Sequence, residues 1–86
     1  MKQEVIKLES RYKDVDSNLI QIEDNKYLLN TNSKYVRLSR VRPSRDMIIH
    51  SIDLEGGPMI SIGDTIQGKK IKSIKSQYVI EFEWFI

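Results

Sequence analysis

The chain has 86 residues, 14 of them basic and 12 acidic, and a formal net charge of +2. This length predicts one small domain, residues 1–86, and leaves no room for a second. Cysteine is absent, which excludes a disulfide framework, a thiolate metal site and a thiol nucleophile.

The location is predicted from the N-terminal sequence and from hydropathy. Residues 1–13 carry a charge every two or three positions, so they lack the apolar core of a signal peptide. No run approaches the roughly 20 apolar residues that span a bilayer. We therefore expect a cytoplasmic protein without a membrane partner. Isoleucine is the commonest residue and alanine is absent, which indicates a low-GC bacterium or its phage, and then the host cytoplasm.

The first periodic segment covers residues 5–13. Ile6, Leu8 and Tyr12 alternate with charged side chains, which predicts a half-buried strand. A helix is the alternative, because Val5, Leu8 and Tyr12 also share a helical face.

A hairpin is predicted for residues 19–29. Asp24 and Asn25 tolerate the positive φ of a tight turn and separate two apolar runs. In this register Glu23 lies opposite Lys26, and Ile22 lies opposite Tyr27. The face expected to be buried comprises Ile20, Ile22, Tyr27 and Leu29.

The middle of the chain continues with strands and turns. Residues 34–41 form the next predicted strand, and a turn with proline in second position follows at 42–45. Residues 47–54 alternate again, and the side chains expected on one face are Ile48, His50, Ile52 and Leu54. Residues 55–58 break the chain, and residues 59–62 resume it.

The stretch 62–71, IGDTIQGKKI, is close to a phosphate-binding loop. Lys70 stands where that loop needs a serine or threonine, and too little chain follows for the required helix and strands. Two turns, at Gly63-Asp64 and Gln67-Gly68, are the simpler interpretation.

The C-terminal residues predict a final hairpin. A two-residue turn at Ser76-Gln77 would place lysines opposite glutamates and one apolar pair between them: Lys72 with Glu81, Lys70 with Glu83, and Ile71 with Phe82. The predicted fold is all-β: a small antiparallel barrel or sandwich of SH3-like or OB-like size with five to seven short strands.

Two segments are candidate binding sites. The first, within residues 34–45, contains basic side chains and one tyrosine without an acid: Lys34, Tyr35, Arg37, Arg40, Arg42 and Arg45. Its arginines could contact phosphates while Tyr35 stacks on a base, although a solvated face balanced by charges elsewhere is the alternative.

The second candidate is the apolar C-terminus, Trp84, Phe85 and Ile86. Tyr78, Ile80, Phe82, Trp84 and Ile86 form the predicted core face, which leaves Phe85 on the charged face. If the final strand lies at a sheet edge, it could pair with a partner strand or another copy. Alternatively, Phe85 packs beneath the N-terminal residues.

Catalytic and metal sites are weakly indicated. His50 is the only histidine, and on an apolar face it is expected to be a core or barrel-lumen residue rather than a base. Residues 14–18 open like a calcium loop, but Leu19 replaces its turn glycine and Asn25 its closing glutamate. We expect no enzyme activity, no metal and no cofactor.

The composition and motifs favour a non-catalytic protein-interaction module: an accessory subunit, an assembly component or a phage-encoded inhibitor. Its expected partner is another protein or further copies of the chain. The alternative is a small nucleic-acid-binding barrel that uses the basic segment 34–45.

Overall fold

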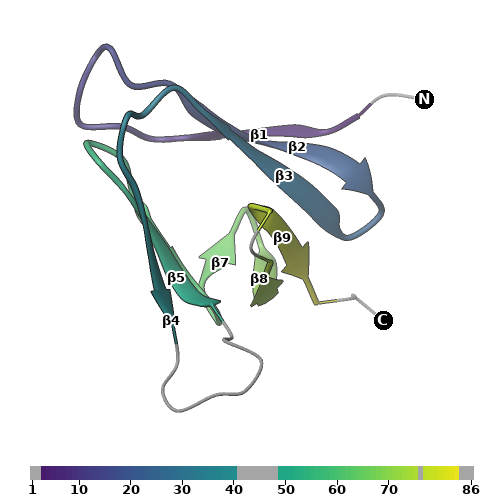
Figure 1. The fold of residues 1–86 in the computed structure, drawn as a ribbon. Helices are drawn as coiled ribbons and strands as arrows, with labels where there is room; N and C mark the ends of the chain where they lie inside the picture. The colour runs from purple at the N-terminus through teal and green to yellow at the C-terminus, as the bar shows by residue number, and fades with distance from the viewer. Residues whose placement is uncertain (1–2, 41–48, 76, 84–86) are drawn as a thin grey trace.

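The computed structural model describes residues 3–40, 49–75 and 77–83 (Figure 1). Within these ranges the chain forms nine strands and no helix, which confirms the all-β prediction. The strands are β1 (Val5–Leu8), β2 (Ser17–Glu23), β3 (Lys26–Thr31), β4 (Val36–Arg40), β5 (Ile49–Leu54), β6 (Met59–Ser61), β7 (Thr65–Ile66), β8 (Lys69–Ile74) and β9 (Val79–Phe82). The count exceeds the predicted five to seven, and one of the nine strands, β7, is only two residues long.

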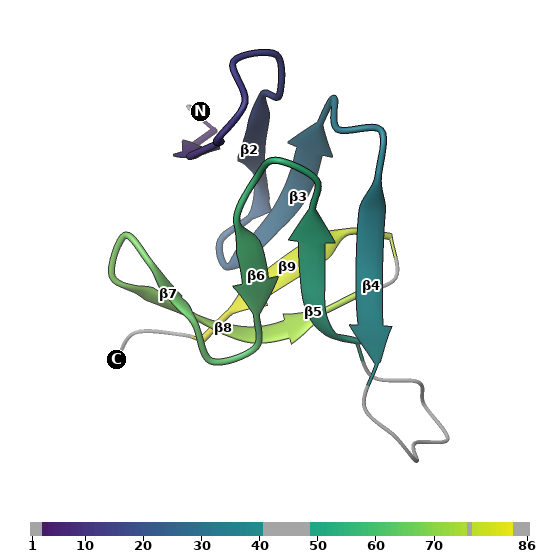
Figure 2. The same cartoon turned by 90° about the vertical axis from the view of Figure 1, so that its left-hand side faces the viewer.

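The strands form two antiparallel sheets. Six strands curl into a half-barrel in the order β1-β2-β3-β9-β8-β7, and the smaller sheet has the order β4-β5-β6. In Figure 2 the strands β5 and β6 run in front of β8 and β9, and residues of β5 contact residues of β8. The smaller sheet therefore covers the concave side of the half-barrel. The described ranges include no helix long and apolar enough to cross a bilayer.

The core lies between the two sheets. It consists of the inward side chains of both sheets: Ile6, Leu8, Leu19, Tyr27, Leu29, Ile49, Ile52, Leu54, Ile60, Ile71, Ile74, Ile80 and Phe82. Tyr27 and Phe82 are among its largest side chains. Their rings meet edge to face, with ring centroids 5.1 Å apart. This arrangement aligns the electropositive edge of one ring with the face of the other.

The β2–β3 hairpin confirms the predicted turn but not the predicted buried face. Glu23 pairs with Lys26, whereas Tyr27 lies opposite Gln21, because Ile22 is the extra residue of a β-bulge. A bulge shifts the register by one residue and so exchanges the two faces. The prediction that Ile20 and Ile22 are buried with Tyr27 is therefore wrong: the inward position belongs to Leu19, and Ile22 is 47% exposed.

A second bulge changes the position of His50. Ser39 pairs with Ser51 and Arg40 pairs with Ile49, so that His50 is the extra residue of β5 without a partner on β4. His50 is exposed while Ser51 and Ile49 are buried. The prediction of a core or lumen histidine is therefore wrong. The predicted turn at 42–45 lies outside the described residues.

The turn interpretation of residues 62–71 is confirmed. Gln67 has φ 50° and Gly68 has φ 81°, the pair of positive values found in a two-residue type I′ hairpin turn. Gly63, with φ 91°, forms the preceding reversal. The chain continues from Gly68 directly into strand β8, where a phosphate-binding loop would begin a helix.

Two of the three pairs predicted for the C-terminal hairpin are correct. Ile71 lies opposite Phe82, and the Glu83 N–H donates to the Lys70 carbonyl at 2.8 Å, but Ser73, not Lys72, lies opposite Glu81. The connection is one residue longer than predicted, because the Tyr78 N–H donates to the Lys75 carbonyl and Tyr78 has φ 64°. A bulge between Ile71 and Ser73 compensates for the extra residue.

Strand β9 lies between β3 and β8, inside the six-stranded sheet. The hypothesis that the final strand is a sheet edge is therefore wrong for Val79–Phe82. At the other end of the chain, the strand prediction holds for Val5–Leu8, and the helix alternative is rejected. Tyr12 lies beyond β1 and is exposed.

Three polar side chains connect distant parts of the half-barrel. The Tyr27 hydroxyl donates to Glu4 Oε1 over 2.9 Å, and Lys69 Nζ donates both to that hydroxyl and to Glu4 Oε1. The hydrogen bonds from Lys69 and then Tyr27 lower the pKa of Glu4 below its usual value of 4.5. Burial lowers the pKa of Lys69, but its hydrogen bonds to Glu4 and Tyr27 outweigh this effect and raise it.

We expect this network to make stability sensitive to acid. Because the folded chain binds fewer protons at Glu4 than the unfolded chain, the stability it contributes is present above pH 4.5 and is lost as the pH falls through the lowered pKa. Glu4→Gln should be less stable at pH 7 and less acid-sensitive than wild type. Urea denaturation between about pH 3 and pH 7 measures both effects. Glu9→Gln, at an exposed glutamate, is the control, and equal pH profiles for the two variants would contradict the assignment.

Candidate interaction surfaces

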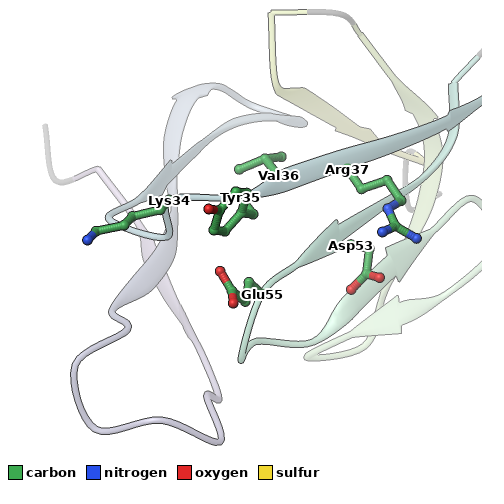
Figure 3. Close-up of a pocket in the computed structure, with 6 residues that line it drawn as sticks. All are labelled: Lys34, Tyr35, Val36, Arg37, Asp53 and Glu55. Atoms are coloured by element: carbon green, nitrogen blue, oxygen red, sulfur yellow. The ribbon is translucent and has the colours of Figure 1, made fainter.

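Part of the first predicted site lines an open depression of about 670 Å³ beside β4. Its lining residues are Lys34, Tyr35, Val36, Arg37, Asp53 and Glu55 (Figure 3). Tyr35 is 67% exposed, and its carbonyl accepts a hydrogen bond from the Glu55 N–H at 3.1 Å. The structure thus brings three predicted residues, Lys34, Tyr35 and Arg37, to one exposed place.

Two acids lie beside these basic residues. Arg37 and Asp53 are cross-strand partners on β4 and β5, and Glu55 follows at the end of β5. Figure 3 shows the Arg37 guanidinium and the Asp53 carboxylate on the same side of the two strands, with the Lys34 ammonium pointing away from them. The lining of the depression therefore has two positive and two negative groups, which weakens the attraction for a phosphate backbone.

The remaining predicted site residues are placed only in part. Arg40 belongs to β4 by its backbone. Arg42 and Arg45 lie outside the described residues, as do all three of Trp84, Phe85 and Ile86.

The structure places His50 and one of the two acids near it in sequence. His50 is an exposed bulge residue, and Asp53 lines the depression beside Arg37, whereas Asp46 lies outside the described residues. Among residues 3–40, 49–75 and 77–83, no group of three or more acidic or histidine side chains could hold a metal ion.

Sequence reasoning missed an apolar row on the outer face of the half-barrel. Val5 pairs with Ile20, Ile20 pairs with Leu28, and Leu28 pairs with Val79, so these residues cross four adjacent strands in register. Cross-strand partners point to the same side of a sheet. Each strand places a buried residue directly beside its row member, namely Ile6, Leu19, Leu29 and Ile80, so the row faces away from the core. We call Val5, Ile20, Leu28 and Val79 the outer row.

The outer row is open to solvent. Val5 is 57% exposed and Leu28 is 39% exposed, while Ile20 and Val79 are half-buried. Polar residues border the row on both sides: Lys7, Asn18 and Asn30 on one side, and Glu23, Lys26 and Glu81 on the other. An apolar strip with a polar rim is the usual composition of a protein-binding surface.

The sequence contains part of the signal for this row. Ile20 and Leu28 lie within the predicted hairpin, but the expected register placed Ile20 on the buried face. Only the bulge at Ile22 turns Ile20 outward, and only the sheet order brings Val79 beside Leu28. The side-chain periodicity of a single strand predicts neither the bulge nor the order of the strands in the sheet.

Comparisons with protein-family models, curated proteins and solved structures found no match to this chain.

Proposed function

We propose that this protein is a non-catalytic protein-interaction module that binds its partner through the outer row. The observation that carries the proposal is the alignment of four apolar side chains across β1, β2, β3 and β9 on the solvent side of the sheet. Isolated exposed apolar residues are common on monomers, whereas an apolar strip that continues in register across four strands offers a partner a continuous surface to cover.

The energetic argument rests on Val5 and Leu28. Complete burial of an aliphatic side chain contributes about 1.5–3 kcal/mol, and both residues retain a large exposed fraction that a partner could cover. These two residues alone could contribute about 2 kcal/mol on binding, after allowance for their partial burial. The surrounding sheet is already ordered, so little conformational entropy is lost.

The roles compatible with this proposal are an accessory subunit, an assembly component or a phage-encoded inhibitor, and we propose a cytoplasmic location. Nucleic-acid binding through the basic segment remains the alternative function. It is less favoured because Asp53 and Glu55 lie beside Arg37 and Lys34 in the depression.

Leu28→Lys tests the proposal, because it places a charge in the middle of the outer row. Asn30→Lys is the matched control: it adds the same side chain to the same exposed face of β3, one row away. We expect Leu28→Lys to keep the fold and to weaken partner binding at least tenfold, and Asn30→Lys to have a smaller effect. Quantitative pull-down from a lysate of the source cell, with circular dichroism for the fold, measures both.

A folded Leu28→Lys variant that retains the same proteins as wild type would contradict the proposal. A mobility shift with nucleic acid at low salt that disappears in an Arg37→Glu variant would support the alternative instead. The two outcomes are distinct, because Arg37 lies on the smaller sheet and Leu28 on the half-barrel.

A further inference from the structure

We propose that the outer row also pairs with the outer row of a second copy of this chain, forming a face-to-face dimer. Its two-fold axis runs parallel to β2 and β3 and passes between them. The inference rests on the proposed function, because it assigns one partner to the same surface.

This axis matches the apolar row with itself. It places each outward residue of β2 opposite the residue of the second copy that occupies its cross-strand position on β3. Ile20 therefore faces Leu28 of the second copy, and Val5 faces Val79 of the second copy. Because the outer row lies on the convex side of the half-barrel, the two copies approach most closely along β2 and β3, about 10 Å apart as in a β-sandwich, and Val5 and Val79 lie at the margins of the contact.

The charged border of the row is self-complementary under the same axis. Glu23 and Lys26 are cross-strand partners, so Glu23 of each copy faces Lys26 of the other. Within one chain, Lys26 Nζ and Glu23 Oε2 are 3.3 Å apart, and both side chains are partly exposed. The dimer would therefore join two such pairs into a cluster of alternating charges.

The size of the surface predicts a weak dimer. Four strands about 4.8 Å apart and three rows about 7 Å apart would cover at most roughly 400 Å² on each copy, and the convex shape reduces this area. The total of at most about 800 Å² lies below the range of stable complexes. We therefore expect a dissociation constant on the order of 100 µM, so that the surface stays available to a partner that binds more tightly.

Charge reversal of the hairpin pair is the sharpest test. In the Glu23→Lys variant the new lysine of each copy lies opposite Lys26 of the other copy. In the Lys26→Glu variant the new glutamate of each copy lies opposite Glu23 of the other copy. Each single variant should weaken the dimer roughly tenfold, whereas the double variant Glu23→Lys/Lys26→Glu should restore it, because the opposite charges only exchange positions. Sedimentation equilibrium of the whole chain at about 5 to 500 µM measures the dissociation constants.

Wild type that stays monomeric over this range, or a double variant as weak as the single ones, would overturn the dimer. Urea denaturation at low concentration verifies that the variants fold, since Glu23 and Lys26 also pair within one chain. If wild type is monomeric and Leu28→Lys still loses its lysate partner, the proposed function stands and only the second copy is wrong. If Leu28→Lys dimerises like wild type, the outer row is not the dimer surface.

Discussion

Phe82→Ala should remove most of the free energy of unfolding at room temperature. Phe82 is 1% exposed, and its ring meets the Tyr27 ring edge to face. Its backbone is held to Asn25 in both directions: the Phe82 N–H donates to the Asn25 carbonyl at 2.8 Å, and the Asn25 side-chain amide donates to the Phe82 carbonyl at 3.1 Å. The main chain therefore cannot easily move to fill the cavity that alanine leaves.

The expected loss is about 3–5 kcal/mol, the usual cost of replacing a buried phenylalanine by alanine. A domain of this size has a free energy of unfolding of roughly 5 kcal/mol, so the variant retains little or no stability. Glu81→Ala, on the outward face of the same strand, should cost at most about 1 kcal/mol. Urea denaturation followed by circular dichroism gives both values, and a Phe82→Ala variant within about 1 kcal/mol of wild type would place Phe82 outside the core.

Gly56→Ala should destabilise the connection between the two sheets. Gly56 follows β5 with φ 74°, and its carbonyl accepts hydrogen bonds from the Arg11 N–H at 2.6 Å and the Ser10 hydroxyl at 2.8 Å. A Cβ atom added to Gly56 would lie 2.1 Å from Cδ2 of Tyr12. The substitution therefore combines an unfavourable backbone conformation with displacement of the Tyr12 ring.

Gly68→Ala separates these two effects. Gly68 has φ 81° and no neighbouring atom within 4 Å of an added Cβ, so alanine there costs only the left-handed conformation, about 1 kcal/mol. Gly56→Ala should cost about 2–3 kcal/mol, because the displaced ring adds to that penalty.

The double variant Gly56→Ala/Tyr12→Ala checks the origin of the difference. In the Tyr12→Ala background the aromatic ring is absent. There, Gly56→Ala should lower the free energy of unfolding only as much as Gly68→Ala does in the wild-type chain. Denaturant midpoints of the five proteins, wild type included, provide the comparison. Equal costs for Gly56→Ala and Gly68→Ala in the intact chain would mean that the exposed Tyr12 ring moves away freely.

The two candidate sites differ in whether their residues are close together in the sequence. The basic cluster could be predicted because Lys34, Tyr35 and Arg37 are neighbours in sequence. Its positive charge is balanced by Asp53 and Glu55, which the sequence does not place beside it. The outer row was not readable, since its members come from positions 5, 20, 28 and 79 and become neighbours only through the order of four strands. Charge balance and surface apolarity are both properties of strand pairing.

The sequence by itself determined the strands and most of the turns. Alternation of side chains and the conformational preferences of Asp24-Asn25 and Gln67-Gly68 act over a few residues, so they are readable without the rest of the chain. The tertiary structure decided which faces are buried. Bulges at Ile22 and His50 each insert one residue into a ladder, and with a side-chain period of two, one residue exchanges the inner and outer faces. Local preferences hardly distinguish the two registers, whereas packing of Leu19, Tyr27 and Ile52 between two sheets does.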